Sequence, residues 1–268
     1  MSRIAIVAAM HEELSALLEA MPDEAPVRRA GREFWVGHLE GHEVVAVLSR
    51  VGKVAAATTA TLLVSEFDVD RAIFTGTAGG LHECARVGDV VVADALLQHD
   101  MDASPLFPRY EVPLYGTDRF CTDPHLSQAL AQAVRAVLDD VARLAASEAA
   151  ARTDTEPGLG LDAHLLRSFG IASPGVHTGL VVSGDRFVAT AAEGADLRRR
   201  LPDALAVEME GAALAQVCHD LDIPFAVVRT VSDRADDSAH VDFGRFVASI
   251  ASRYTLAIIR RFLRRRDH

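Results

Sequence analysis

Cysteine is scarce in this sequence, and its scarcity excludes two kinds of protein. The 268 residues include three cysteines, Cys84, Cys121 and Cys218, which are odd in number and far apart. Their spacing fits neither a disulfide framework nor a zinc site, and no cluster of histidine, cysteine and aspartate has the spacing of metal ligands. We therefore expect no bound metal, and a cytoplasmic protein with reduced thiols.

Positively charged residues are fewer than negatively charged ones. Lysine and arginine total 27 residues against 38 aspartates and glutamates, so the formal net charge is −11 at pH 7. An acidic chain is a poor ligand for a phosphate backbone, and we expect no nucleic-acid partner. Apolar runs are short as well. None reaches the roughly 18 residues of a membrane span, and the N-terminal run is too short for a signal peptide, so we expect no membrane partner.

Strand-like and helix-like patterns alternate along the chain. Short unbroken apolar runs predict buried strands at 3–9, 71–80, 87–97, 175–185 and 223–233. A hairpin is expected around Glu40-Gly41. Helical patterns cover 12–18, 51–67, 123–147 and 242–265. This alternation predicts an α/β domain with a parallel or mixed central sheet. Within it, residues 145–175 include a loop-like composition and are expected to form an insertion or a mobile segment.

Polar or glycine-rich segments follow the strand-like runs. The five segments are "AAMHEE", "TGTAGG", "VSGDRF", "VEMEG" and "RTVSD". In open α/β sheets the ligand site lies beyond the carboxyl ends of the strands. The pattern therefore predicts that these segments share one site for a small molecule.

Two glutamates, Glu208 and Glu210, interrupt the apolar segment "AVEMEG". An unpaired buried carboxylate costs several kcal/mol or takes up a proton. If the strand runs from 204 to 210, both glutamates lie on one face and Met209 on the other. Two acids on one face need partners or different tasks. We expect backbone or an arginine to hold one of them, and the other to face a ligand hydroxyl.

Other polar residues near these segments allow two interpretations. Asp233 follows Arg229 by four residues, so it either pairs with that arginine or donates a proton to a substrate. Glu12 and Asp185 either cap helices or face the site. Among the scattered histidines, His99 and His240 lie near candidate segments and are the candidates for contact with a ligand.

The ordered set of segments resembles one family. The segments that match are "IAIVAAMHEEL", "VGKVAAATTATLL", "TGTAGGL", "VGDVVVAD", "GLVVSGDRF", "AVEMEGAALAQVC" and "PFAVVRTVSDRAD". Together they resemble the 5′-methylthioadenosine/S-adenosylhomocysteine nucleosidases of the purine nucleoside phosphorylase superfamily. The resemblance implies a single domain over 1–268, folded as a three-layer α/β/α sandwich around a mixed sheet, and a homodimer. It also implies hydrolysis of a thio-nucleoside with release of adenine and with no cofactor.

The resemblance also implies roles for individual residues. Glu13 matches the base that activates the attacking water, and Asp233 matches the acid that protonates N7 of adenine. Glu210 and the backbone of Met209 match the ribose contacts, while Phe187 and Val188 match the purine contacts. The remaining expected substrate contacts are Thr77 and Arg229 near the water, Ser232 beside the acid, and Met10, Val51 and Phe243 around the sugar and the 5′ group.

Several alternatives remain within this resemblance. The strand-end segment "FTGTAGG" lacks the arginine that related phosphorylases use for phosphate, and an acid stands at position 13, so hydrolysis is favoured over phosphorolysis. A futalosine-type hydrolase and a non-catalytic nucleoside-binding relative are the other readings. The sequence departs from the family at Phe74 and over 99–116, where Phe107, Pro113 and Tyr115 are candidate contacts to the 5′ substituent. The preferred 5′ group therefore stays open.

Overall fold

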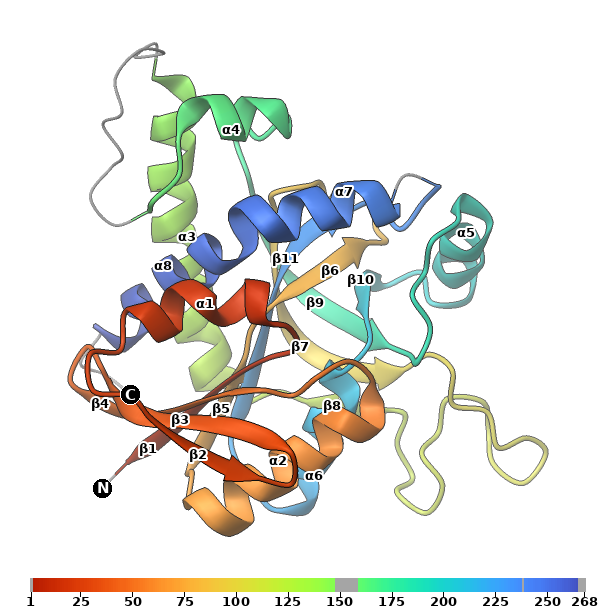
Figure 1. The fold of residues 1–268 in the computed structure, drawn as a ribbon. Helices are drawn as coiled ribbons and strands as arrows, with labels where there is room; N and C mark the ends of the chain where they lie inside the picture. The colour runs from red at the N-terminus through yellow and green to blue at the C-terminus, as the bar shows by residue number, and fades with distance from the viewer. Residues whose placement is uncertain (1, 148–158, 238, 265–268) are drawn as a thin grey trace.

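The fold is a mixed sheet covered by helices (Figure 1). The computed structural model describes residues 2–147, 159–237 and 239–264. Its strands are β1 (Arg3–Ala8), β2 (Ala25–Arg29), β3 (Arg32–Leu39), β4 (His42–Leu48), β5 (Arg71–Phe74), β6 (Thr77–Gly80), β7 (Val90–Gln98), β8 (Arg119–Cys121), β9 (Val176–Ser183), β10 (Ala204–Glu208) and β11 (Phe225–Asp233). They pair in the order β2-β3-β4-β1-β5-β11-β6-β10-β9-β7-β8.

One strand, β11, joins the two halves of this sheet. Its first residues pair in parallel with β5, and its last residues pair in parallel with β6. Between them, Val228–Thr230 pair antiparallel with Val90–Val92 of β7. Because β7 also pairs with β9, the strands β11, β6, β10, β9 and β7 close into a ring. The ring contains the three strands β9, β10 and β11, whose ends carry polar segments singled out in the sequence.

Helices cover both faces of the sheet (Figure 1). The helices are α1 (His11–Glu19), α2 (Lys53–Phe67), α3 (Pro124–Ala146), α4 (Ala163–Ser168), α5 (Ala191–Arg200), α6 (Gly211–Asp220), α7 (Ala239–Phe246) and α8 (Ser252–Leu263), with a π-helical turn at Val247–Ala251 between the last two. Side chains of α1, α3 and α8 share one apolar cluster, whereas those of α2 and α6 share another. The predicted three-layer α/β fold with a mixed sheet is therefore confirmed. No helix of the described part of the chain is long and apolar enough to cross a membrane.

The strand β1 shows why the sheet carries two cores. Ile4 and Ile6 belong to the cluster of α1, α3 and α8, while Ala5 and Val7 belong to the cluster of α2 and α6. Successive side chains of a strand point to opposite faces, so an unbroken apolar run buries both faces at once. This is the sequence pattern from which the buried strand was predicted.

The longest helix begins where its sequence predicts. Asp123 caps α3, and its side chain accepts a hydrogen bond from the Leu126 N–H at 2.8 Å. Pro124 follows at the first helical position, where its missing N–H costs nothing. The predicted helix over 123–147 is confirmed.

Other predicted boundaries were wrong. The expected strand over 71–80 is two strands, because the chain breaks at Thr75-Gly76. The segment expected over 204–210 leaves the strand after Glu208, so Glu210 caps α6 and does not share a strand face with Glu208. The final helical region begins at Ala239 and contains the π-helical turn. The elements β2, β8, α4, α5 and α6 were not predicted.

The sequence predicts an insertion or a mobile segment at 145–175. Its stretch 148–158 lies outside the described residues. The described remainder carries α4, and its apolar side chains Leu159, Leu161, Leu166 and Ile171 are buried in the cluster of α1, α3 and α8. This part of the segment is therefore integral to the core.

Candidate active site

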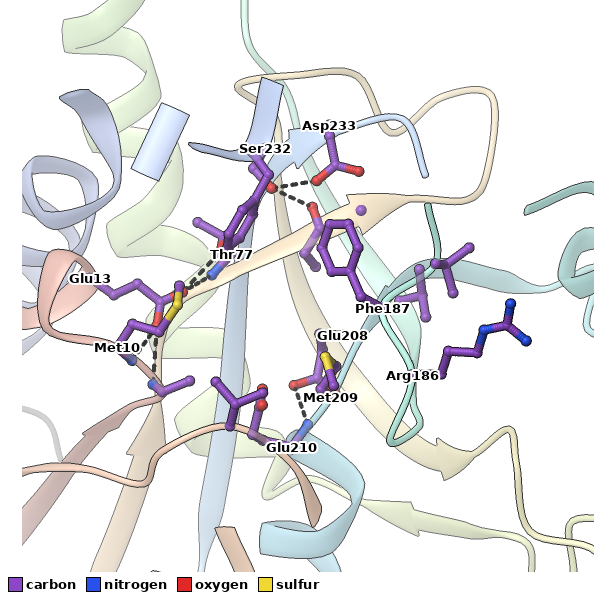
Figure 2. Close-up of a pocket in the computed structure, with 17 residues that line it drawn as sticks. Met10, Glu13, Thr77, Arg186, Phe187, Glu208, Met209, Glu210, Ser232 and Asp233 are labelled. Carbon is purple, nitrogen blue, oxygen red and sulfur yellow. Dashed lines mark hydrogen bonds between the residues drawn. The ribbon is translucent and has the colours of Figure 1, made fainter. Parts of the chain in front are cut away.

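The strand ends converge on one cavity, as the sequence predicts. It lies beyond β1, β9, β10 and β11 and beside β6, and it encloses about 560 Å³ of empty space including its open mouth. Figure 2 shows Glu13 on one side of this cavity, Asp233 on another, and Glu210 on a third.

Glu13, in the first turn of α1, is held by four hydrogen bonds. Its Oε2 accepts from the N–H groups of Ala9 and Met10 at 3.0 and 3.1 Å. Its Oε1 accepts from both the N–H and the hydroxyl of Thr77 at 2.9 Å. The carboxylate is buried yet lines the cavity. The bonds fix its position between β1 and β6, because its donors come from the ends of both strands.

Gly76 explains why the chain breaks before β6. Its φ is +148°, in a region that favours glycine. A Cβ at this position would lie 2.9 Å from Oε1 of Glu13, closer than real Cβ contacts. Glycine at position 76 therefore allows the backbone to lie close to the carboxylate of Glu13.

Asp233 is oriented by its own strand end. Its Oδ2 accepts from the Ser232 hydroxyl at 2.8 Å, and its Oδ1 accepts from the Ala235 N–H at 2.9 Å. The Ser232 hydroxyl also reaches the carbonyl of Ala78 at 3.3 Å (Figure 2). Asp233 is 2% exposed and lines the cavity. Its carboxyl group is thus fixed on the opposite wall from Glu13.

Glu208 forms a buried ion pair with Arg229. The Arg229 guanidinium donates to Glu208 Oε2 at 2.7 Å, and both side chains are nearly inaccessible to water. Glu208 also accepts from the N–H groups of Glu210 and Gly211 and from the Ser183 hydroxyl. The Arg229 guanidinium lies over the Phe74 ring, 4.0 Å from its centroid. Every charge of this pair therefore has a partner.

Glu210 has fewer partners than Glu208. Its Oε1 accepts from the Gly52 N–H at 2.8 Å, and its side chain lines the cavity. Burial and the neighbouring Glu208 charge raise the pKa of Glu210 to about 8. A proton on this carboxyl group is therefore retained near neutral pH while the cavity holds no ligand.

A polar network fixes the loop that carries Gly52. Lys53, the single lysine of the chain, donates from Nζ to Asp100 at 2.6 Å and to Gln98 at 3.1 Å. Its N–H donates to Asp185 at 2.8 Å, and the Asp185 N–H donates to Asp100 at 2.9 Å. Asp185 thus bonds the backbone at the start of α2. The network holds the Gly52 N–H in place for Glu210.

Apolar side chains complete the cavity. The rings of Phe187 and Phe243 pack edge to face with centroids 5.6 Å apart. Val188 and Met209 line the same space, and Val51, 53% exposed, lines it as well. This combination of an apolar wall with a few fixed carboxylates suits a flat heterocycle joined to a hydroxylated group.

Eleven of the twelve predicted site residues line this cavity: Met10, Glu13, Val51, Thr77, Phe187, Val188, Met209, Glu210, Ser232, Asp233 and Phe243. Arg229 is not among the lining residues of the cavity and pairs with Glu208. The sequence allowed Arg229 a structural pair with Asp233, whereas the ion pair that the structure describes is with Glu208.

Sequence reasoning left out several lining residues. Ala78 and Gly79 belong to the "TGTAGG" turn, and Arg186 precedes Phe187, so the motifs contained them without singling them out. Ala9, Val207 and Glu208 also line the cavity. The candidate contacts Phe107, Pro113 and Tyr115 are not among the lining residues of this chain.

The two candidate histidines have different outcomes. His99 does not line the cavity; its buried ring lies against Gly184, and burial lowers its pKa. The side chain of His240 lies outside what the structure describes. Among the described residues, no group of three or more histidines, cysteines or acids is placed to hold a metal ion.

Comparisons with known proteins agree with this architecture. The sequence model of the phosphorylase superfamily matches residues 3–264. The 5′-methylthioadenosine/S-adenosylhomocysteine nucleosidase of Neisseria meningitidis, solved with methylthio-immucillin-A, is 31% identical, with a TM-score of 0.81 over 98% of this chain and 99% of that one. The corresponding enzyme of Colwellia psychrerythraea, solved with adenine, is 29% identical, with a TM-score of 0.80 over 98% and 94%. The futalosine hydrolase of Helicobacter pylori is 28% identical, with a TM-score of 0.76 over 97% of both chains.

These matches extend over nearly the whole chain, and the first comes with a sequence identity that marks common descent. The chain belongs to the phosphorylase superfamily. Within that superfamily it is a member of the 5′-methylthioadenosine/S-adenosylhomocysteine nucleosidase family.

The raised pKa of Glu210 predicts that the ligand-free protein loses stability as the pH rises from about 5 to about 8. In this window the folded protein keeps the proton on Glu210, whereas the unfolded chain releases it. Unfolding is then favoured by up to about 1.4 kcal/mol for each pH unit. Glu210→Gln, neutral in both states, should remove this contribution. Urea unfolding of both proteins across the window measures it, and equal pH dependence would contradict the assignment.

The buried pair predicts a large stability loss on truncation of the arginine. Arg229→Met leaves Glu208 buried without its counter-charge and should lower the free energy of unfolding by about 3–5 kcal/mol. Arg29→Met, which removes the exposed pair with Glu66, is the control and should cost at most about 1 kcal/mol. Denaturant titration compares the two variants. Similar losses of unfolding free energy in the two variants would show that the buried pair contributes no more to stability than the exposed pair.

Proposed function

We propose that this protein hydrolyses the N-glycosidic bond of 5′-methylthioadenosine, S-adenosylhomocysteine or both, releasing adenine and a 5-thioribose. The observation that carries the proposal is the pair of buried carboxylates, Glu13 and Asp233, on separate walls of one cavity. Glycosidic cleavage needs an acid for the leaving group and a base for water on the other side of the sugar. Similarity to the Neisseria meningitidis nucleosidase supports the choice of nucleoside.

The proton balance assigns one task to each carboxylate. Asp233, in its acid form, gives a proton to N7 of adenine as the bond to C1′ breaks, so the base leaves as neutral adenine. The sugar becomes positively charged in the transition state, and the nearby carboxylates stabilise that charge. Water then attacks C1′, and Glu13 takes its proton. Thr77 holds Glu13 in the required position through two hydrogen bonds.

The other lining residues have binding roles. Glu210 and the backbone of Met209 hold the ribose hydroxyls, because adjacent hydroxyls suit a carboxylate with two acceptor oxygens. Phe187 and Val188 hold the purine, and Ser232 orients Asp233. Met10, Val51 and Phe243 surround the sugar and the 5′ group.

The charges of the cavity support hydrolysis over phosphorolysis. The Glu13 carboxylate, on the wall where the nucleophile is expected, would repel a phosphate dianion. Arg229 is engaged by Glu208, and Arg186, the arginine in the lining, is exposed and paired with Glu193. The described cavity thus offers no unengaged guanidinium for phosphate. Similarity to the Helicobacter pylori futalosine hydrolase makes a futalosine-type nucleoside the second candidate substrate.

Base release tests this proposal and its alternatives. We expect adenine from 5′-methylthioadenosine and S-adenosylhomocysteine at the same rate with and without phosphate. Release that requires phosphate would indicate a phosphorylase. Hypoxanthine from futalosine, with no adenine from the thio-nucleosides, would indicate the second candidate. Absence of base release from every nucleoside would indicate a binding protein without catalysis.

Asp233→Asn tests the acid directly. Asparagine keeps the shape of the side chain but supplies no acidic proton, so turnover should fall by at least about 10²-fold. Single-turnover adenine release measures the chemical step, and a binding titration with 5′-methylthioadenosine checks that the site is intact. Turnover near the wild-type rate would remove Asp233 from the acid role.

A homodimer of cytoplasmic location is part of the proposal. Exposed apolar side chains support it: Val54 in α2 is 79% exposed, and Leu106 and Leu114 in the loop after β7 are 83% and 90% exposed. We expect sedimentation to give twice the chain mass of 28.8 kDa. Leu114→Asp should shift the protein toward that single-chain mass, and a wild-type protein of 28.8 kDa would contradict the dimer.

A further inference from the structure

A second hollow adjoins the cavity on the side of Met10. Ala9 and Met10 line both spaces, and Arg50 lines the hollow while its neighbour Val51 lines the cavity. The far side of the hollow is the β2–β3 hairpin, with Arg28, Arg32 and Trp35. We name this hollow the arginine groove. The two spaces therefore share a wall at Ala9 and Met10, beside the expected position of the 5′ substituent.

Arg50 has a backbone conformation that its residue type disfavours. Its φ is +67°, in the left-handed region where glycine is the usual residue. Local strain of this kind concentrates at functional sites. The side chain donates to the Gly31 carbonyl in the hairpin turn, which uses one of its five N–H donors. The exposed guanidinium therefore lies over the groove with donors left for a ligand.

The groove brings two guanidinium groups together. Arg32 is anchored by neutral acceptors, the Thr59 hydroxyl and the carbonyls of Ala30 and Ala55. Its pKa is lowered by burial and then by the positive charge of Arg50. Of the two acids lining the groove, Glu33 is engaged by Arg28, and Glu12 is exposed on the opposite side. An anion between Arg50 and Arg32 would relieve their repulsion.

We propose that the arginine groove binds a carboxylate at the end of the nucleoside's 5′ substituent, with Arg50 as the main contact. This inference rests on the proposed function, in which Met10 and Val51 surround the 5′ group. A simple carboxylate and the carboxylate of an α-amino acid share this chemistry. An α-amino acid would also place its ammonium group toward Glu12, across the groove from the arginines.

Matched nucleosides separate this inference from the proposed function. The pair is 5′-(3-carboxypropylthio)adenosine and its primary amide, which have nearly the same shape but differ in charge and in one acceptor oxygen replaced by an NH2 group. Wild-type protein should prefer the carboxylate by about 10-fold or more in kcat/KM, because charge-assisted hydrogen bonds to guanidinium are strong. The preference should fall to about 1- to 3-fold in both Arg50→Met and Arg50→Gly. The glycine variant suits the backbone, so a shared result cannot come from strain. Arg29→Met, outside the groove, should keep the preference.

Two further readouts decide the remaining outcomes. Trp35 is the single tryptophan of the chain, so binding of the carboxylate, and less so of the amide, should change its fluorescence whether or not turnover follows. The Glu12→Gln variant distinguishes an α-amino-acid tail from a simple carboxylate. If the ammonium group of the tail contacts Glu12, kcat/KM should fall for S-adenosylhomocysteine and not for the carboxypropyl compound. If 5′-methylthioadenosine is turned over but the carboxylate is not preferred over the amide, carboxylate binding in the arginine groove is contradicted and the proposed nucleosidase activity is not. Neither turnover nor binding of any of these nucleosides would overturn both.

Discussion

The ion pair between Arg229 and Glu208 is the interaction on which the site depends. It joins β11 to β10, and through Ser183 and Gly211 it also reaches β9 and α6. Separating a buried charge pair is costly, because it leaves a buried charge without compensation. Here the Phe74 ring covers the guanidinium and backbone N–H groups fill the carboxylate, while Nε of Arg229 has no hydrogen-bond partner among the described residues. The strand ends that carry the candidate chemistry are therefore fixed relative to one another.

Around this pair, four carboxylates have four different environments. Glu208 is neutralised by arginine, and Glu13 is held by backbone N–H groups and a hydroxyl. Asp233 is held by a serine and one N–H, and Glu210 has one N–H and a raised pKa. Like charges in one small space are tolerable when environments separate their protonation. The same separation gives each group a distinct task in the proposed reaction.

The loop from Arg50 to Lys53 connects this chemistry to substrate choice. Gly52 donates to Glu210, Val51 lines the cavity, and Arg50 lies over the arginine groove. Lys53 ties the loop to Asp100, and the Lys53 N–H bonds to Asp185, so the loop position does not rest on Glu210 alone. One short segment thus positions Glu210, lines the cavity and lines the arginine groove.

Local patterns in the sequence determined the elements and their meeting point. Unbroken apolar runs predicted β1, β7, β9 and β11, and the polar segments after them predicted a shared site, because strand carboxyl ends in such sheets form a common edge. Short elements such as β2, β8, α4, α5 and α6 were missed, since segments of three to ten residues show little periodicity. The glycine-rich turn after Phe74 was predicted, but the group that the backbone approaches at Gly76, the carboxylate of Glu13, is 63 residues away in the chain and could not be read from the pattern.

Only the tertiary structure decided which charges pair. The sequence narrowed Glu208 and Glu210 to one supporting and one ligand-facing acid, and it placed Arg229 near the substrate. Folding put Arg229 behind the cavity with Glu208, left Glu210 with the Gly52 N–H, and brought Arg50 beside Arg32. Burial, neighbouring charge and hydrogen-bond partners depend on three-dimensional contacts, which the spacing of residues along the chain does not give. For that reason the residue types fixed the available chemistry, and the fold assigned each group its protonation and its role.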